Sequence, residues 1–353
     1  MKAVVKTNRE RGVEFKEIDP PEMSEQDVLV KVEAVSICGS DLHMYEGMKA
    51  YEWVATPVIL GHEFAGTVVN VGKPEYEHLL NQRVIINPYV PCGDCYNCQR
   101  GNTNLCDYGS NAMAKVPAKS LRYGFRTNGG MAEYAAIHYK NVLPIPDELP
   151  IEVAGMLEAL AIGVKALERS DIKPGDTAVV IGPGPIGLSM VASLSNYGLR
   201  KLIITGLHAD EERLQLAKEL GATDIVYADE VNDVEAVSAI TDGQGVDHIF
   251  ETSGFHQSLV SAVRMCTKGG EVLLVGISAK ETTLPTHEIV RGEVTVKGVY
   301  GVTETTLRRT ISMAASGKYP YAKLISHVLP LEDVVNGFEY GLKKQGAKVI
   351  LKP

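Results

Sequence analysis

Four of the six cysteines of the chain lie within the segment PCGDCYNCQRGNTNLC at residues 91–106. They are spaced with two residues between the first three and seven before the last, at Cys92, Cys95, Cys98 and Cys106. Two intervening residues form a turn that points neighbouring sulfurs into one tetrahedral site, so the spacing favours a structural zinc with four thiolate ligands. Such a site has no open coordination position, and it would fold a lobe of the chain without catalysing a reaction.

Disulfide bonds and a redox pair are the alternatives for these cysteines. The N-terminal stretch MKAVVKTNRE has neither the apolar core nor the cleavage site of a secretory signal, which favours a cytoplasmic protein with reduced thiols. A thioredoxin-like pair would explain only two of the four cysteines. We therefore expect a zinc lobe at 91–106, with redox chemistry as the remaining alternative.

A second set of metal-binding residue types occurs elsewhere. Cys38 lies in SICGSDLHMY, and His62 and Glu63 lie in ILGHEFAG. One sulfur, one imidazole and one carboxylate can form an open zinc site that leaves a position for water or a substrate oxygen. Glu158, in MLEALAIG, is the fourth candidate, because a buried carboxylate on an otherwise apolar helix needs a partner. Cys266 is expected at a buried helix position without a chemical role.

Composition limits the classes of partner. The net charge of −9 argues against nucleic acid or an anionic membrane as the main partner. The long apolar stretch TAVVIGPGPIGLSMVASL is interrupted by Gly-Pro-Gly-Pro, so we do not expect it to cross a membrane. A length of 353 residues is enough for two domains with their own cores.

The pattern of elements changes near residue 152. The first 150 residues read as short strands separated by turns, and a helical segment then leads into alternating strands and helices. Six short apolar strands with helices between them predict an α/β fold with a doubly wound parallel sheet. The strands near the C-terminus are expected to return to the first domain.

The segment VVIGPGPIGLSM places a glycine-rich turn between a strand and a helix. Gly182, Gly184 and Gly187 form the pattern G-x-G-x-x-G, with Pro185 and Ile186 completing the turn. The first glycine allows the turn, the second admits a pyrophosphate, and the third allows close packing of helix and strand. Within six alternating strands the pattern predicts a dinucleotide-binding site, with an ordinary strand–helix turn as the alternative.

The end of the second strand bears on the choice between NAD and NADP. Gly206 stands where NAD-binding proteins place an acidic residue that holds the ribose. Without that carboxylate a 2′-phosphate is not repelled, and His208 or Arg213 could hold it. Acidic residues at 210–212 and an Arg213 that faces solvent would favour NAD instead. We expect NAD(P), with NADP preferred.

Together these motifs resemble the zinc-dependent medium-chain dehydrogenases, and most closely their polyol, sugar and threonine dehydrogenase branch. The resemblance covers essentially the whole chain, through CGSDLH, GHEFAG, the four-cysteine lobe, GPGPIG and the strand–helix order. It implies a GroES-like catalytic domain at 1–152 and 302–353 around a Rossmann domain at 153–301. It also implies a cleft between the domains where zinc and nicotinamide meet.

The resemblance assigns roles to single residues. Cys38, His62 and Glu63 look like ligands of a catalytic zinc, and Glu158 looks like the exchangeable fourth ligand. Asp41 resembles the carboxylate that orients the zinc-bound imidazole. Ser40 and His43 resemble the relay that carries the alcohol proton to solvent, or they form local hydrogen bonds in a turn.

The implied enzyme holds two zinc ions per chain and oxidises a small-molecule alcohol reversibly to a ketone. Hydride passes to the nicotinamide while zinc lowers the pKa of the alcohol. This branch is usually homotetrameric, with a homodimer as the alternative. Gly301 and Val302 replace an Arg-Tyr pair of polyol dehydrogenases, which argues against sorbitol itself.

Other interpretations stay open. A zinc-free enone or quinone reductase of the same fold would not need the Cys38, His62 and Glu63 set, and a metal-binding scaffold would have no activity. The basic residues Lys115, Lys119, Arg122 and Arg126 follow the fourth cysteine in a segment that is read as a solvated loop or as a border of the substrate cleft.

Overall fold

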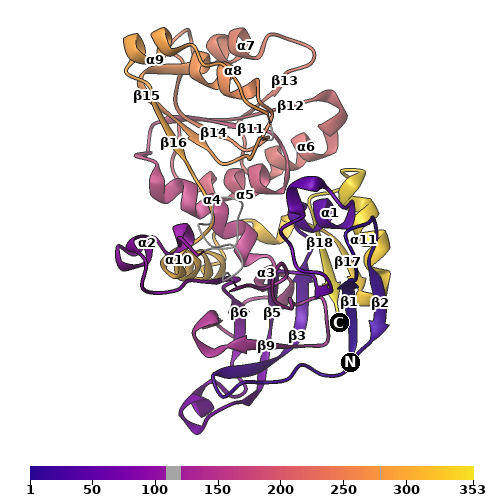
Figure 1. Ribbon diagram of the computed structural model, residues 1–353. Helices are drawn as coiled ribbons and strands as arrows, with labels where there is room; N and C mark the ends of the chain where they lie inside the picture. Colours follow the sequence, from indigo (N-terminus) through magenta and orange to yellow (C-terminus); the bar gives the residue numbers. More distant parts are fainter. Residues whose placement is uncertain (109–120, 279) are drawn as a thin grey trace. The chain divides into compact units, whose positions relative to one another are not determined.

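The computed structural model describes residues 1–108, 121–278 and 280–353 (Figure 1). The chain divides into two compact units. The first contains Met1–Ala159, Val302–Ala315 and Ile325–Pro353, and the second contains Leu160–Gly301 and Ser316–Leu324.

The first unit is built on a seven-stranded sheet. Its path runs β10-β6-β5-β3-β18-β17, with β9 paired to β3. The strands are β3 (Asp27–Ser36), β5 (Glu63–Val71), β6 (Arg83–Ile86), β9 (Tyr134–His138), β10 (Val142–Pro144), β17 (Ile325–Pro330) and β18 (Lys348–Lys352). Inward residues of β3 alternate with less buried ones, as expected for a strand with one face on the core. The C-terminal strand β18 thus pairs with β3, which begins the sheet in sequence.

Smaller elements complete this unit. A three-stranded sheet holds β1 (Lys2–Lys6), β2 (Glu14–Glu17) and β4 (Val58–Ile59), and β7 (Tyr89–Val90) pairs with β8 (Leu121–Arg122). The helices are α1 (Gly39–Tyr45), α2 (Tyr96–Gln99), α3 (Ile151–Ala154), α4 (Leu157–Arg169), α10 (Glu304–Ala315) and α11 (Val334–Leu342). The boundary between the units falls inside α4, after Ala159.

The second unit is a six-stranded sheet in the order β13-β12-β11-β14-β15-β16. Its strands are β11 (Thr177–Ile181), β12 (Lys201–Gly206), β13 (Asp224–Tyr227), β14 (Val246–Glu251), β15 (Cys266–Leu274) and β16 (Thr295–Gly298), and every pair is parallel. This is the strand order of a Rossmann fold, which confirms the predicted doubly wound sheet. Strand β11 is buried along its whole length, as expected for a central parallel strand.

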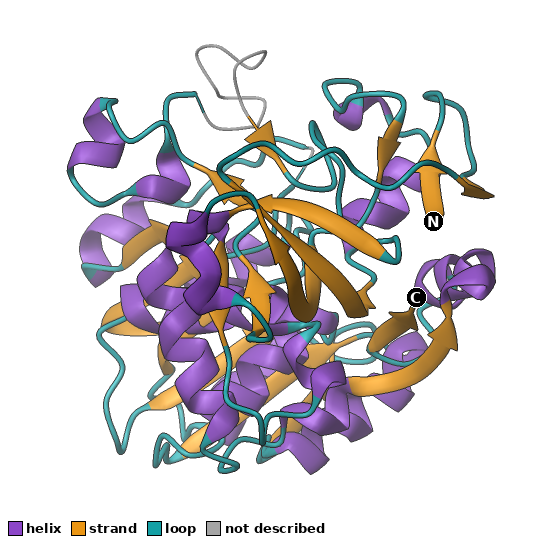
Figure 2. Ribbon diagram, turned by 90° about the horizontal axis from the view of Figure 1, so that it is seen from below, coloured by secondary structure: helices purple, strands orange, loops and turns teal. Residues whose placement is uncertain are grey.

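Helices cover this sheet. They are α5 (Pro185–Leu194), α6 (Glu211–Leu220), α7 (Asp233–Ile240), α8 (Ser258–Met265) and α9 (Thr286–Gly292). Helix α5 contacts α6, and α8 contacts both α7 and α9, so the two groups lie on different faces of the strands (Figure 1). Figure 2 shows the helices of the chain in purple and the strands in orange.

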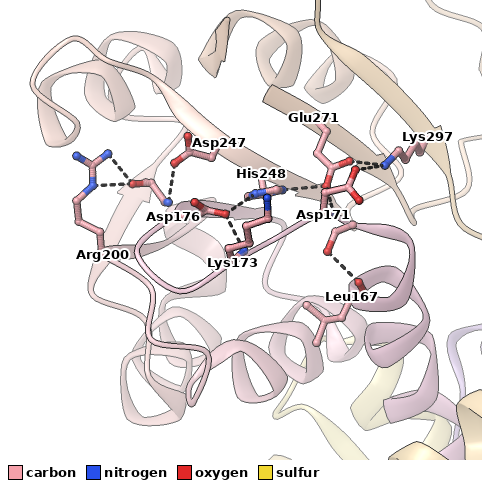
Figure 3. Close-up of polar contacts among 11 residues, drawn as sticks. Leu167, Asp171, Lys173, Asp176, Arg200, Asp247, His248, Glu271 and Lys297 are labelled. Carbon is pink, nitrogen blue, oxygen red and sulfur yellow. Dashed lines mark hydrogen bonds and ion pairs between the residues drawn. The ribbon is translucent and has the colours of Figure 1, made fainter. Parts of the chain in front are cut away.

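Charged side chains join the starts of the central strands of the second unit (Figure 3). The imidazole of His248 contacts the Asp176 carboxylate through Nε2 and the Glu271 carboxylate through Nδ1, both at 2.9 Å. Glu271 also accepts the backbone N–H of Asp171 at 2.7 Å and pairs with Lys297 Nζ at 2.7 Å. Ligands of such sheets bind at the carboxyl ends of the strands, so this network at the opposite ends serves stability.

Two sequence expectations meet the structure here. Cys266 is the first residue of β15 and not a helix residue, and burial raises the pKa of its thiol to about 12, which leaves it unreactive. Within residues 1–108, 121–278 and 280–353, none of the helices has the length and apolar character needed to cross a membrane.

Candidate metal centres and cofactor loop

Strand pairing brings the second set of metal-binding residue types together. Ser36, at the end of β3, is the register partner of Glu63, at the start of β5. Cys38 follows two residues after Ser36, and His62 precedes Glu63. Cys38, His62 and Glu63 therefore lie at the same end of the paired strands β3 and β5. Cys38, His62 and Glu63 each offer one ligand atom, and these atoms lie within 4.8 Å of one another.

The buried Asp41 carboxylate orients this group. Its Oδ2 accepts the backbone N–H of Cys38 at 3.0 Å, and its Oδ1 lies 3.6 Å from His62 Nδ1. Nε2 of His62 therefore faces the other way, where Ser40 Oγ lies 3.4 Å from it. Burial alone would lower the pKa of His62, but the Asp41 carboxylate and the Cys38 sulfur outweigh it and raise that pKa well above its ordinary value.

Glu63 is bound by a lysine that the sequence analysis did not identify. Lys348, the first residue of β18, places Nζ 2.6 Å from Glu63 Oε2 and 3.1 Å from the carbonyl oxygen of Ile37. Burial acts to lower the pKa of Lys348, but Glu63 and Cys38 outweigh it and raise the pKa. A lysine within the apolar strand AKVILKP was the available signal, because lysine is rarely fully buried unless it is paired.

Glu158 is also buried, in the first turn of α4. Burial raises the pKa of its carboxyl group, as does the nearby Glu63, while His62 and Arg122 act to lower it. These charges are near enough to shift the pKa of Glu158. Its carboxylate is nevertheless not one of the three groups whose ligand atoms lie within 4.8 Å of one another.

Aromatic rings lie between His62 and His43 of this unit. The ring of His62 lies 4.7 Å from Phe125, which stacks on Trp53 at 5.5 Å, and Tyr51 lies between Trp53 and His43. His43 is exposed, although partial burial of its ring lowers its pKa.

Two basic residues of the segment after the fourth cysteine are described. The Arg122 guanidinium lies 4.1 Å from the Phe125 ring centroid, and Arg126 donates to the Trp53 carbonyl at 2.8 Å. Lys115 and Lys119 lie outside the described residues.

The four clustered cysteines converge as their spacing predicts. Sγ–Sγ distances are 3.9 Å for Cys92 and Cys98, 3.9 Å for Cys95 and Cys106, and 3.5 Å for Cys92 and Cys106. A disulfide would need about 2.05 Å, whereas four thiolates around a tetrahedral zinc lie about 3.8 Å apart. Burial acts to raise the pKa of Cys95, but the Asp107 amide and neighbouring groups lower it to about 6, which favours a thiolate.

Both groups fit a bound zinc. The lobe offers four sulfurs at tetrahedral spacing. In the other group, the buried Glu63 Oε1 has no hydrogen-bond partner within the described part of the chain. A buried carboxylate oxygen without a partner costs free energy that a cation beside it would offset.

The glycine-rich turn has the geometry of a phosphate-binding loop. Gly182 adopts φ +98°, and its N–H donates to the Thr205 carbonyl at 2.9 Å. A Cβ on Gly187 would lie 2.0 Å from the Gly182 oxygen, so helix and turn are in close contact. A Cβ on Gly184 would meet nothing within 4 Å, so its surface is open to a ligand. Pro185 opens α5 and is followed by Ile186, and the helix N-terminus favours an anion there.

The end of β12 is more constrained than its sequence suggests. A Cβ on Gly206 would lie 2.9 Å from the Pro183 ring and 3.0 Å from Leu214. His208 is exposed, donates its backbone N–H to Asp229 at 2.9 Å and has its Nδ1 3.0 Å from Glu230. Arg213 is buried within α6, and burial lowers its pKa, so it is not on the surface where a phosphate would arrive.

Gly184 and Gly187 give a matched test of the glycine-rich turn. Gly184→Ala should leave the free energy of unfolding within about 1 kcal/mol of the parent but weaken binding of the dinucleotide, because its methyl group would stand where the pyrophosphate approaches. Gly187→Ala should lower stability by about 1–3 kcal/mol through the close contact with Gly182. Chemical denaturation and fluorescence titration with NADH and NADPH measure both effects. Unchanged binding in Gly184→Ala would argue against a pyrophosphate at this turn.

Comparison with known proteins identifies the family of the chain. Residues 24–147 match the family described as alcohol dehydrogenase GroES-like domain, and residues 185–316 match zinc-binding dehydrogenase. The chain is 34% identical to L-threonine 3-dehydrogenase of Bacillus velezensis, covering 100% of this chain and 99% of the relative. It is 33% identical to sorbitol dehydrogenase of Bacillus subtilis, covering 100% and 97%.

Solved structures give the same result. A protein from Sinorhizobium meliloti bound to NADP superposes with a TM-score of 0.90 at 28% identity, covering 100% of this chain and 99% of that one. An alcohol dehydrogenase of Escherichia coli complexed with NADH superposes with a TM-score of 0.89 at 27% identity and the same coverage. Because both family descriptions and full-length relatives match, the chain belongs to the zinc-dependent medium-chain dehydrogenases, in the branch that includes threonine and sorbitol dehydrogenases.

Proposed function

We propose that the chain oxidises a secondary alcohol of a polyol, sugar, sugar acid or hydroxy amino acid to the ketone, reversibly and with NAD(P). The observation that carries this proposal is the group of Cys38, His62 and Glu63, in which His62 and Glu63 are buried and one carboxylate oxygen is without a partner among the described residues. A zinc-free reductase would have no use for that group. Membership of the family and the open face at Gly184 support the cofactor.

In this proposal each residue has a defined task. Zinc, when bound, supplies a Lewis acid that lowers the pKa of the alcohol. Cys38, His62 and Glu63 hold the metal, and Asp41 fixes the His62 ring with Nε2 toward it. The Ser40 hydroxyl, beside His62, would accept the alcohol proton and pass its own proton on toward His43, which at the surface would release a proton to solvent.

The remaining parts of the chain have supporting roles. We assign catalysis to residues 1–152 and 302–353 and cofactor binding to 153–301. The second zinc, in the lobe at 91–106, stabilises its loop. Glu158 would be the exchangeable ligand, because its buried carboxyl group is near enough to His62 and Glu63 for their charges to shift its pKa. Tyr51 and Trp53 continue the aromatic run that begins at His62 and Phe125.

Metal content and turnover test the zinc assignment together. The parent should hold two zinc ions per chain. Cys38→Ser and His62→Ala should each hold one and lose all but a few per cent of activity, because the alcohol is no longer activated. Ser40→Ala should keep both ions and slow turnover by about 10²-fold, as for loss of a positioned proton-transfer group. A panel of polyols, sugars, sugar acids, threonine and short secondary alcohols identifies the substrate.

Two measurements keep this test specific. Cys95→Ser should also hold one zinc, but its loss should appear as lower thermal stability, because the lobe ligates its own ion. Cofactor binding should stay at the parental level in His62→Ala, since the glycine-rich turn is unchanged. A parent with a single zinc, or a His62→Ala variant that retains substantial turnover, contradicts the proposed mechanism.

We further propose that NADP is preferred over NAD. Gly206 offers no carboxylate to repel a 2′-phosphate, and the exposed His208 imidazole can donate to one. Arg213 is buried in α6, so in this proposal it does not contact the 2′-phosphate and acts on it only as a more distant positive charge. The carboxylates of Asp229 and Glu230 beside His208 act in the opposite direction and moderate the preference.

Substitutions at His208 and Glu230 should shift cofactor preference in opposite directions. His208→Ala should lower kcat/KM for NADP relative to NAD by about 10-fold or more, the value of one charge-assisted hydrogen bond. Glu230→Gln should raise it, because a carboxylate near the phosphate is removed. Gly206→Asp is a poorer test, since its side chain would displace Pro183. A parent that prefers NAD by a hundredfold would overturn the proposal.

We propose a homotetramer, with a homodimer as the alternative. Strand β16 is the edge of its sheet, and the exposed side chains Ile277 and Val290 lie on neighbouring segments of the same unit. An exposed edge with apolar neighbours is suited to pairing with a second copy. Sedimentation velocity should show a tetramer, and Val290→Asp should weaken it. A monomeric parent at micromolar concentration would contradict this.

A further inference from the structure

The pair of Lys348 and Glu63 is unusual in its burial. Side-chain exposure is 3% for Lys348 and 1% for Glu63, and their contact at 2.6 Å joins residues 285 positions apart. Ile350, two residues after Lys348, is the register partner of Ser36, which also pairs with Glu63. The central strand β3 therefore fixes both members of the pair.

The two oxygens of Glu63 have different surroundings. Oε2 accepts the charge-assisted hydrogen bond from Lys348, whereas Oε1 is buried without a hydrogen-bond partner among the described residues. Charge-assisted bonds of this kind are short and strong, so Lys348 engages Oε2 firmly. The second anchor of Lys348, the Ile37 carbonyl, keeps the ammonium from following the carboxylate if it rotates.

This arrangement matters for a metal on Cys38 and His62. A carboxylate can bind a metal through one oxygen or through both, and binding through both fills one more coordination position. A catalytic zinc needs an open position for its substrate, and a further anionic contact makes it a weaker Lewis acid. Glu158, also nearby and acidic, adds to the negative charge that Lys348 offsets.

We propose that Lys348 is a positioning residue that withholds one oxygen of Glu63 from the catalytic zinc, so that the metal keeps an open coordination position. The inference rests on the zinc assignment above, and it goes beyond it by giving the C-terminal strand a task in the reaction. Lys348 does not touch the substrate. It acts through Glu63.

The chain contains a matched control for the test. Lys352, on the same strand, contacts Glu152 at 2.7 Å, but its side chain is 38% exposed and its partner is not one of the proposed zinc ligands. Lys348→Met removes the ammonium and keeps the length of the side chain, Lys348→Arg keeps the charge, and Lys352→Met repeats the first change at the control position.

The measurements separate coordination from activity. Each protein is loaded with Co²⁺, and the visible spectrum of each variant is compared with that of the parent, so that the contribution of the four-cysteine lobe cancels. Lys348→Met should bind two ions but absorb more weakly in the visible range, as Co²⁺ does when its coordination number exceeds four. Its zinc form should lose activity by about 10- to 100-fold, mainly in kcat. Lys348→Arg should recover most of both effects, and Lys352→Met should match the parent.

Several results would overturn the proposal. An unchanged Co²⁺ spectrum in Lys348→Met, or loss of the second ion, would show that Lys348 does not withhold an oxygen. Equal effects in Lys352→Met would point to the strand rather than to the pair. If Lys348→Met does not fold, a crystal structure of the zinc-loaded parent decides, because Oε1 alone should contact zinc while Oε2 stays on Lys348. A parent with only one zinc would contradict the proposed function instead.

Discussion

Three carboxylates withdrawn from water constrain the first unit more than any other feature. Asp41, Glu63 and Glu158 are all buried, and an ionised carboxylate in such a place needs a partner. Asp41 has the Cys38 amide and His62, and Glu63 has Lys348. Among the described residues, Glu158 is influenced by the charges of His62, Glu63, Arg122 and Lys348, and burial raises its pKa. The ligand set is therefore balanced only in part by the chain itself, and a divalent cation would complete the balance.

The second unit has a different constraint, which is the close approach of the backbone of the glycine-rich turn to the start of α5. Gly182 and Gly187 pack so closely that no side chain fits between them, while Gly184 faces open space. The tightness of the turn also involves Thr252, whose hydroxyl donates to the carbonyls of Ile181 and Gly182. At the opposite ends of the strands, His248 joins carboxylates from two segments. These contacts fix the amino ends of the strands, and they leave the carboxyl ends, where such sheets bind their ligands, without this charged network.

Local patterns predicted most of the chemistry. The spacing of the four cysteines, the three glycines and the alternation of strands and helices depend on neighbouring residues, and a sequence displays these directly. Lys348 was missed because its role depends on the register of β18 against β3, which no short segment shows. The packing of Gly206 against Pro183 and the burial of Arg213 were missed for the same reason. Each follows from contacts between residues that the sequence separates.

The order of the chain has a consequence for how the metal centre forms. Cys38, His62 and Glu63 are present once the first strands have paired, but the cation that offsets Glu63 comes from the last strand. Until β18 pairs with β3, the Glu63 carboxylate lacks its lysine and would be costly to bury. Before β18 pairs, we therefore expect the side of the sheet that carries Cys38, His62 and Glu63 to stay exposed to water. Pairing of β18 with β3 supplies that cation, so the burial of Glu63 and the finished sheet depend on the same strand.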